Sequence, residues 1–233
     1  KAADIDREGD LDLIFGCEDG NKIFINNGSG YFADETTLRL PVYGNEETRK
    51  VTLSDVDSDG DLDIFFANVS FIAGRNPQDR LLLNNGSGIF TDVTGSNIPF
   101  DNEHTMEGLF LDFNFDGKPD LITSNVFVNR PVKAFVNQGG GVFSEVTSKV
   151  FPPSVFAEGL GMKIDFFNND TLPDIYVVHR RSNTSGGSDL LLFRENISSI
   201  NVNQLSSQVP EYFKLHQNFP NPFNPETEIR FSL

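Results

Sequence analysis

The stretch Ser54–Phe66 reads SDVDSDGDLDIFF and decides the fold of this chain. It places five aspartates within nine positions, 55–63, directly before a run of strand-forming residues. Carboxylates about 4 to 6 Å apart repel each other, at a cost of about 1 kcal/mol per pair even in water. The stretch therefore predicts a bound cation that offsets the repulsion.

The same pattern occurs four times in the chain. The copies begin 51, 57 and 53 residues apart (55 − 4, 112 − 55 and 165 − 112), and β-forming residues follow each one. A repeat of this length indicates supersecondary units that stack on one another. We name the copies loop 1 (DIDREGDLD, 4–12), loop 2 (DVDSDGDLD, 55–63), loop 3 (DFNFDGKPD, 112–120) and loop 4 (DFFNNDTLPD, 165–174).

A glycine-rich signal follows each of the first three loops. It reads NNGSGYF at 26–32, NNGSGIF at 84–90 and NQGGGVF at 137–143. Asn-Gly between apolar runs predicts a tight hairpin, because both residues tolerate positive φ. The second repeat then contains four strands, at VTLSD, LDIFFAN, RLLLN and IFTDVT.

Four-stranded units of this size cannot bury both faces alone, so they stack around an axis as the blades of a propeller. We therefore expect an all-β fold over 1–200, a partial β-propeller of about four four-stranded blades with the acidic loops between strands. Phe32, Phe90 and Phe143 should be equivalent and pack between blades. Only 1–3 precede loop 1, so the first blade is expected to lack its leading strand and further blades to precede it.

The loops also fit a calcium site. Each offers side-chain oxygens at positions 1, 3, 5 and 9 and a main-chain carbonyl at position 7, and such hard oxygen ligands select Ca²⁺ over zinc or softer metals. Position 12 lies in a strand, which excludes an EF-hand. The predicted Ca²⁺ ligands are Asp4, Asp6, Glu8, Asp10 and Asp12 in loop 1; Asp55, Asp57, Asp59, Asp61 and Asp63 in loop 2; Asp112, Asn114, Asp116, Lys118 and Asp120 in loop 3; and Asp165, Asn168, Asp170, Leu172 and Asp174 in loop 4.

Loop 4 departs from the other three loops. It has one extra residue, and Thr171 stands where loops 1 to 3 have glycine at position 6. Its ligands converge only if the extra Phe bulges out of the loop. The alternative for any single loop is that Asp-Gly simply forms a hairpin turn. That alternative does not explain acidic residues at alternating positions, repeated along the chain.

The acidity of the chain is concentrated in these loops. They contain 16 of the 34 acidic residues and two of the 18 basic ones, so they carry 2 − 16 = −14 of the net charge of −16. Such a chain lacks the basic surface that nucleic-acid binding requires. Its apolar runs are far shorter than the roughly 20 residues that span a bilayer. We expect no nucleic-acid partner and no membrane span, and the single Cys17 excludes an internal disulfide.

The DxDxDGxxD loops and the NNGSGxF turns together resemble the FG-GAP or VCBS repeat family over about residues 1–200. This resemblance implies an extracellular calcium-binding β-propeller, similar to integrin α-subunit heads, that serves adhesion or ligand binding. It also implies that the positions given above are the calcium ligands.

Residues 214–233, KLHQNFPNPFNPETEIRFSL, resemble the start of the C-terminal sorting domain of proteins exported by the type IX secretion system. The resemblance implies secretion, with the type IX machinery as a partner, and it makes 201–213 a linker. It covers only the first strand of that domain. We therefore expect the chain to be truncated at both ends.

Three functions compete at this point. The leading hypothesis is a secreted or cell-surface binding and adhesion module without enzymatic activity, whose connections, such as 70–80, contact an unidentified extracellular protein or glycan. The alternative is the propeller portion, or a carbohydrate-binding accessory, of a secreted polysaccharide-active enzyme. That alternative requires a general acid and base in one pocket, and no such pair is recognisable in the sequence. A structural spacer without a ligand is the third hypothesis.

Overall fold

The chain divides into two units, Lys1–Asn203 and Gln204–Leu233. In the second unit, β17 (Lys214–Leu215) pairs antiparallel with β18 (Phe231–Ser232). The predicted linker and the rest of the resemblance to a sorting domain lie almost entirely outside the described residues. The structure, a computed structural model, describes residues 1–42, 44–100, 102–126, 132–151, 159–168, 170, 172–179, 189–194, 200–201, 214–215 and 231–232.

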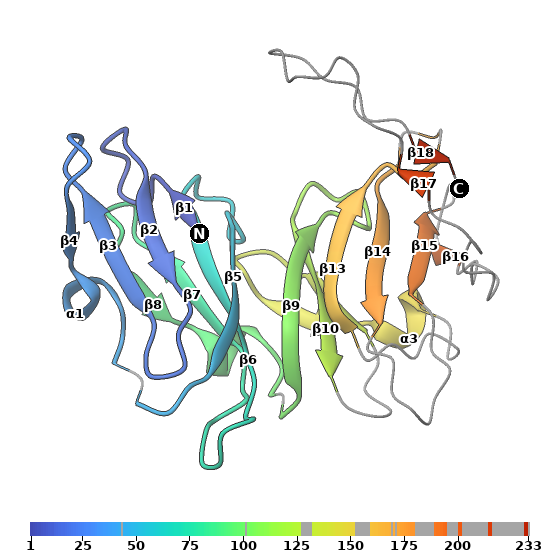
Figure 1. Cartoon of the computed structure of the whole chain (residues 1–233), viewed down its shortest axis with the longest axis horizontal. Helices are drawn as coiled ribbons and strands as arrows, with labels where there is room; N and C mark the ends of the chain where they lie inside the picture. The colour runs from blue at the N-terminus through green and yellow to red at the C-terminus, as the bar shows by residue number, and fades with distance from the viewer. Residues whose placement is uncertain are drawn as a thin grey trace. The chain divides into compact units, whose positions relative to one another are not determined.

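The first unit is built from four four-stranded antiparallel sheets, and the strands of each sheet pair in chain order (Figure 1). Loops 1 to 4 connect the first strand to the second in each sheet. The strands are β1 (Ala2–Ala3), β2 (Asp12–Phe15), β3 (Lys22–Asn26) and β4 (Phe32–Asp34) in sheet 1; β5 (Thr48–Ser54), β6 (Asp63–Asn68), β7 (Arg80–Asn84) and β8 (Phe90–Asp92) in sheet 2; β9 (His104–Leu111), β10 (Asp120–Val126), β11 (Lys133–Asn137) and β12 (Phe143–Glu145) in sheet 3; and β13 (Gly159–Asp165), β14 (Asp174–His179), β15 (Leu190–Arg194) and β16 (Ile200–Asn201) in sheet 4.

Sheet 1 has a leading strand, so the expectation that it lacks one is wrong. Ala2 pairs with Leu13 and Ala3 pairs with Asp12. A strand of two residues is enough to pair with β2, because loop 1 turns the chain back directly after Ala3. Ala3 itself is buried in the core.

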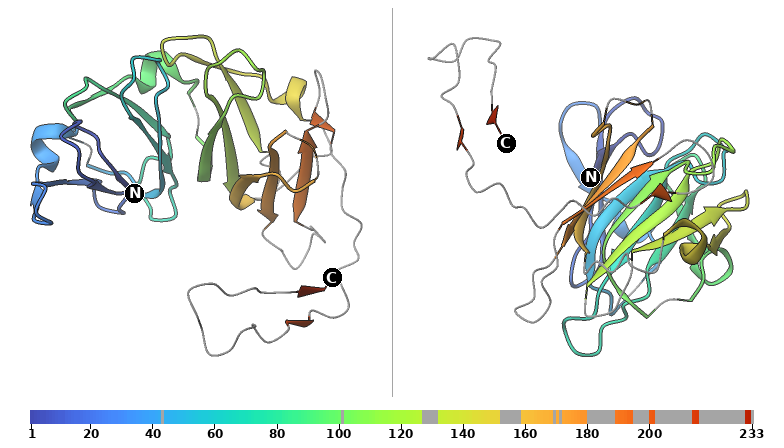
Figure 2. Two further views of the ribbon diagram at one scale, coloured as in Figure 1. Left: turned by 90° about the horizontal axis from the view of Figure 1, so that it is seen from above. Right: turned by 90° about the vertical axis from the view of Figure 1, so that its right-hand side faces the viewer.

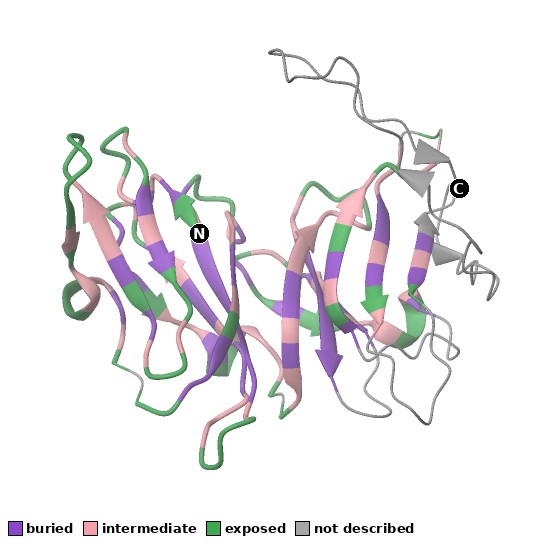
Figure 3. Ribbon diagram, in the orientation of Figure 1, coloured by how far each residue is buried: buried purple, intermediate pink, exposed green. Residues whose placement is uncertain are grey.

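The sheets stack face to face in chain order (Figure 2). Along β6, Ile64 and Phe66 join a hydrophobic cluster with sheet 1, whereas Phe65 joins a cluster with sheet 3. Ile122 of β10 and Ile175 of β14 belong to a third cluster, shared by sheets 3 and 4. Successive residues of a strand point to opposite faces, so β6 is buried along its whole length (Figure 3). This explains its unbroken apolar run.

The first strands of neighbouring sheets contact one another, β5 with β9 and β9 with β13. This arrangement is that of propeller blades, and the predicted all-β fold of about four four-stranded blades is confirmed. Phe90 and Phe143 are each 4% exposed and pack in the clusters between sheets, as predicted. Phe32 is 36% exposed. The clusters join Phe90 and Phe143 to the sheet before their own, and the structure describes no sheet before sheet 1.

Each of the first three sheets is followed by a one-turn helix that the sequence analysis missed. The helices are α1 (Thr36–Arg39), α2 (Thr94–Asn97) and α3 (Thr147–Val150). The hydroxyl of each first-position threonine accepts a backbone N–H from the third strand of its own sheet, at 3.0, 3.0 and 3.2 Å. No helix within the described ranges is long and apolar enough to cross a membrane.

Candidate metal centre

Loops 1 to 3 share one backbone conformation. Position 6 is glycine with positive φ, as predicted, and position 4 also has positive φ although it is never glycine. This left-handed conformation costs an ordinary residue about 1 to 2 kcal/mol, so the fold of the loop imposes it on three unlike side chains. The φ values at positions 4 and 6 are 65° and 92° in loop 1 (Arg7, Gly9), 68° and 92° in loop 2 (Ser58, Gly60), and 62° and 84° in loop 3 (Phe115, Gly117).

The first aspartate of each of these loops holds the turn closed. Its Oδ2 accepts the backbone N–H of the position-6 glycine at 2.9 to 3.0 Å. A side-chain acceptor that ties its own loop competes with regular secondary structure and fixes a tight turn. The bonded pairs are Asp4 with Gly9, Asp55 with Gly60, and Asp112 with Gly117.

Loops 1 and 2 bring the carboxylates of positions 1, 3 and 9 together. In each loop, one oxygen from each of the three residues lies within 4.8 Å of the others. Ca²⁺ takes oxygen ligands at about 2.3 to 2.6 Å, so ligands on opposite sides of one ion lie about 5 Å apart. We call these groups cup 1 (Asp4, Asp6 and Asp12) and cup 2 (Asp55, Asp57 and Asp63).

Cup 1 contains an unsatisfied acceptor. Oδ1 of Asp4 is buried and has no hydrogen-bond partner among the residues that the structure describes. A buried carboxylate oxygen without a partner is costly, and a divalent cation would satisfy it. The donor set, made of hard charged oxygens, therefore fits calcium.

The predicted ligands at position 5 lie outside the two cups. Glu8 and Asp59 are exposed, and Oδ1 of Asp59 accepts the backbone N–H of Asp61 at 2.9 Å. At position 7 the predicted calcium ligand is the main-chain carbonyl and not the side chain. The side chain of Asp10 is partly buried near the glycine turn of sheet 1, and that of Asp61 forms an ion pair with Arg7 of loop 1.

Loop 3 brings its first and third positions together around one donor. The backbone N–H of Asp116 donates to Oδ1 of Asp112 at 3.2 Å and to Oδ1 of Asn114 at 2.9 Å. Asp116 itself pairs with Lys118, and this pairing lowers the pKa of its exposed carboxyl. Asp120 is fully buried at position 9.

Loop 4 uses its carboxylates differently. Asp165 pairs with Lys163 at 2.8 Å, which lowers the pKa of Asp165. Asn168 donates through Nδ2 to Asp170 at 2.8 Å, and Oδ1 of Asp170 accepts the N–H of Leu172, also at 2.8 Å. Asp174 is buried, and its Oδ2 accepts the N–H groups of 167 and 168 at 3.0 and 3.3 Å. The predicted ligands of loop 4 therefore pair with neighbouring side chains and backbone groups.

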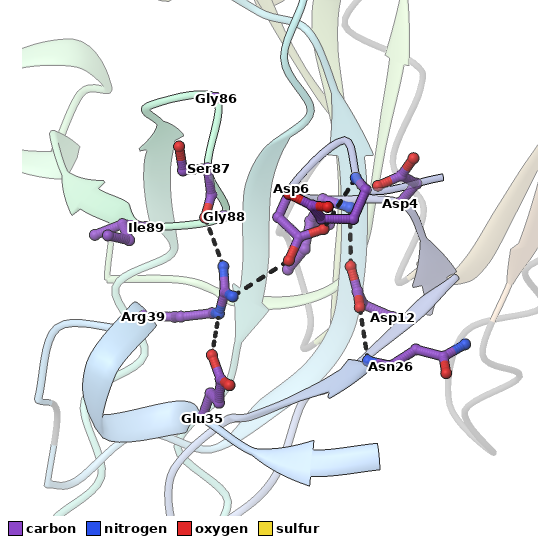
Figure 4. Close-up of polar contacts among 12 residues, drawn as sticks. Asp4, Asp6, Asp12, Asn26, Glu35, Arg39, Gly86, Ser87, Gly88 and Ile89 are labelled. Atoms are coloured by element: carbon purple, nitrogen blue, oxygen red, sulfur yellow. Dashed lines mark hydrogen bonds and ion pairs between the residues drawn. The ribbon is translucent and has the colours of Figure 1, made fainter. Parts of the chain in front are cut away.

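The aspartate at position 9 also has a structural role that the sequence did not reveal. Asp63 accepts the N–H of Val56 in its own loop at 2.8 Å and that of Asn84 at 2.9 Å. Asp12 does the same with Ile5 and Asn26 (Figure 4), and Asp120 with Phe113 and Asn137. Each of these carboxylates thus joins an acidic loop to the glycine turn of the same sheet.

The first asparagine of the glycine turn completes this connection. Asn84 donates through Nδ2 to the carbonyl of Leu62 in loop 2 at 3.2 Å and to that of Ile5 in loop 1 at 2.8 Å. Asn137 bonds to Pro119 and Val56 in the same way, at 3.1 and 2.8 Å. In the sequence, these asparagines predict only tight turns. The recurrence of asparagine at the first position of every glycine turn was the sequence signal for this second role.

Burial raises the pKa of Asp63 to about 7, and the charges of Asp57 and Asp59 add to this effect, while the two backbone N–H groups oppose it. Burial likewise raises the pKa values of Asp12 and Asp120. A cation next to such a buried carboxylate stabilises its charged form and so lowers its pKa.

These shifts predict an unusual pH dependence in calcium-depleted protein. The folded protein keeps a proton on Asp63 at a pH where the unfolded chain, with an ordinary pKa of 3.8, has lost it. The free energy of unfolding should therefore fall as the pH rises from about 4 to about 7. Calcium requires the ionised carboxylates, so its stabilisation should grow over the same window. Calorimetry from about pH 4 to 8 with and without calcium tests both trends. An Asp63→Asn variant with an unchanged pH slope would contradict the assignment.

Comparisons with known proteins agree with this description. A model of the FG-GAP-like repeat family matches residues 4–66 and 55–123, which together span more than half of the chain. Cartilage acidic protein 1 of Xenopus tropicalis is 26% identical over 155 residues, covering 59% of this chain. The chain spans 22% of the length of that relative.

Among solved structures, an Agrocybe aegerita lectin described as recognising non-reducing terminal N-acetylglucosamine is 18% identical, with a TM-score of 0.47. The alignment covers 87% of this chain and 50% of the lectin chain. The repeated acidic loops, their shared backbone and the family match lead to one conclusion. The chain belongs to the FG-GAP-like repeat family.

Proposed function

We propose that this chain is a calcium-binding module of an extracellular protein, and that it binds or adheres to an extracellular protein or glycan without enzymatic activity. The observation that carries the proposal is the convergence of three carboxylates in cup 1 and in cup 2. Similar backbone geometry in loop 3 supports a third site. The resemblance of 214–233 to a type IX sorting domain supports secretion through that machinery.

The residues that would hold calcium in loops 1 and 2 are the six cup aspartates. Bound calcium would supply positive charge that offsets carboxylate repulsion and fills the acceptor capacity of Asp4. The chain's own residues supply the rest of the rigidity. The position-1 aspartates fix each turn, and the position-9 aspartates join loop and glycine turn.

The connection between β6 and β7 is the surface that we propose for partner binding. Its first residues are held rigidly: both Phe71 and Ile72 donate their N–H to Oε2 of Glu47, at 2.8 and 2.9 Å, and Glu47 is fully buried. His104 stacks on the Phe71 ring, with centroids 5.6 Å apart. The guanidinium of Arg49 lies 5.1 Å from the centroid of the same ring.

This connection nevertheless keeps apolar surface exposed. Phe71 is 46% exposed and Ile72 is 41% exposed. An aromatic side chain held in place loses little conformational entropy on binding, which favours it as a contact residue. The connection therefore combines an exposed aromatic surface with a rigid base, as a binding loop requires.

The test is binding of the full chain to arrayed glycans and extracellular-matrix proteins, in calcium chloride and in chelator. We expect a ligand that is retained in calcium and weakened about tenfold or more by Phe71→Ala, since central aromatic contacts are worth about 2 kcal/mol or more. Phe100→Ala is the control, because Phe100 is 86% exposed and lies outside the connection. Absence of any retained ligand would favour the spacer hypothesis, and shortening of a polysaccharide would favour the enzyme hypothesis.

A further inference from the structure

The last residue of a one-turn helix contacts the glycine turn of the next sheet. Arg39, at the end of α1, donates through Nη1 to the carbonyl of Ser87 at 2.5 Å (Figure 4). Asn97, at the end of α2, donates through Nδ2 to the carbonyls of Gly140 and Gly141 at 3.3 and 3.1 Å. Ser87 and Gly140 occupy the same position of their turns. Arg39 and Asn97 are therefore equivalent contacts between consecutive sheets.

The glycines of these turns make room for the contact. A Cβ at Gly88 would lie 2.4 Å from Nη1 of Arg39, and a Cβ at Gly141 would lie 3.7 Å from Nδ2 of Asn97. Both glycines have a φ of 68°. The turn of sheet 2 is thus fitted closely around an arginine, while the turn of sheet 3 is fitted around a smaller, neutral side chain.

The two contacts differ in charge. Arg39 also pairs through Nη2 with Oδ2 of Asp6 at 3.2 Å, and through Nε with Glu35 at 2.8 Å. Asp6 is the third-position carboxylate of cup 1. The side chains of Arg39 and Asp6 are only 13% and 9% exposed, so solvent and salt screen this pair weakly.

Among the described residues, cup 2 has no equivalent of this arginine. Asn97 is neutral, and within the part of the chain that the structure describes no ion pair is formed by Asp57, the third-position carboxylate of cup 2. Arg7 does pair with Asp61 of loop 2, but Asp61 is at position 7 and the Arg7 side chain is 55% exposed. Loops 1 and 2 each contain five acidic residues, so the number of carboxylates does not distinguish them.

We propose that Arg39, by pairing with Asp6, holds the calcium affinity of cup 1 below that of cup 2. The inference rests on the proposed calcium binding of the loops. A guanidinium on a cup carboxylate occupies ligand capacity and repels a divalent ion over a short, weakly screened distance. The two cups then fill in sequence as calcium rises, cup 2 first and cup 1 second.

The position-6 glycines allow each cup to be followed separately. The backbone N–H of Gly9 donates to Asp4 of cup 1, and that of Gly60 donates to Asp55 of cup 2. Their amide signals in ¹⁵N-correlated NMR spectra therefore report on the two cups in one sample. During a titration of the full chain with calcium chloride, the Gly60 signal should reach its midpoint at lower calcium than the Gly9 signal.

A reciprocal exchange of the two contact residues tests the cause. Arg39→Asn introduces the residue that sheet 2 already has, and it should lower the calcium midpoint of Gly9 about five- to tenfold while that of Gly60 stays unchanged. Asn97→Arg should raise the midpoint of Gly60. Lys22→Asn is the matched control, because it removes one positive charge from sheet 1 at a side chain 47% exposed and paired with Asp34 instead of a cup residue.

The outcomes separate the two claims. A Gly9 midpoint that stays unchanged or rises in Arg39→Asn would overturn the inference, because Arg39 would then be neutral or would orient Asp6 for calcium. If neither glycine signal of the unaltered protein responds to calcium, the proposed function fails and the inference with it. Should Arg39→Asn fold poorly, judged by its amide dispersion, Asn97→Arg alone decides: an unshifted Gly60 midpoint contradicts the inference.

Discussion

Replacing Asp63 by alanine is expected to lower the free energy of unfolding by about 2 to 5 kcal/mol, even in calcium-depleted protein. Asp63 is 1% exposed, and its two oxygens accept the backbone N–H groups of Val56 and Asn84. Alanine leaves both donors buried without a partner, and each such donor costs about 1 to 3 kcal/mol. The loss of charge repulsion within cup 2 offsets only part of this cost.

The measurement is urea unfolding followed by circular dichroism, with calcium removed so that metal binding does not contribute. Asp59→Ala is the matched control, since Asp59 is an exposed aspartate of the same loop whose side chain accepts one local N–H, that of Asp61. Its free energy of unfolding should change by less than about 1 kcal/mol. If the two variants lose the same stability, Asp63 is only a candidate metal ligand and its structural role is contradicted.

The sequence predicted those features that depend on local chemistry. Alternating carboxylates, the position-6 glycine of Gly9, Gly60 and Gly117, and the asparagine–glycine turns all act within a few residues, so their repetition revealed the strands, the loops and the four-bladed order. The apolar run of β6 likewise predicted a strand, and the structure shows that this strand is buried on both faces.

The rest could not be predicted because it depends on which repeats become neighbours. Arg39 reaches Asp6 across 33 positions and Ser87 across 48, and Asn84 reaches Ile5 across 79. No local pattern distinguishes such a residue from an ordinary surface arginine or turn asparagine. The one-turn helices were missed because four residues are too short for a helical period, although an acidic residue two positions before threonine precedes all three.

The relation between calcium and stability gives the second large prediction. Calcium at about 100 times its dissociation constant stabilises a protein by about 2.7 kcal/mol per site, provided that only the folded state binds it. The cups exist only where the chain folds loops 1 and 2, so two filled cups should contribute about 5 kcal/mol. For a chain of this size, that raises the melting temperature by about 10 to 20 °C.

Differential scanning calorimetry is the suitable measurement, because the chain has no Trp whose fluorescence could be followed. Magnesium at the same concentration is the control: its octahedral geometry and reluctance to lose water suit these cups poorly, so its effect should be limited to general charge screening. An Asp4→Asn/Asp55→Asn variant should lose most of the calcium response, since Asn keeps the size of the position-1 side chain and removes its charge. An equal response to both ions, or a melting temperature that calcium leaves unchanged, would show that the clustered carboxylates are tolerated without a metal, and the opening interpretation of SDVDSDGDLDIFF would have to be replaced.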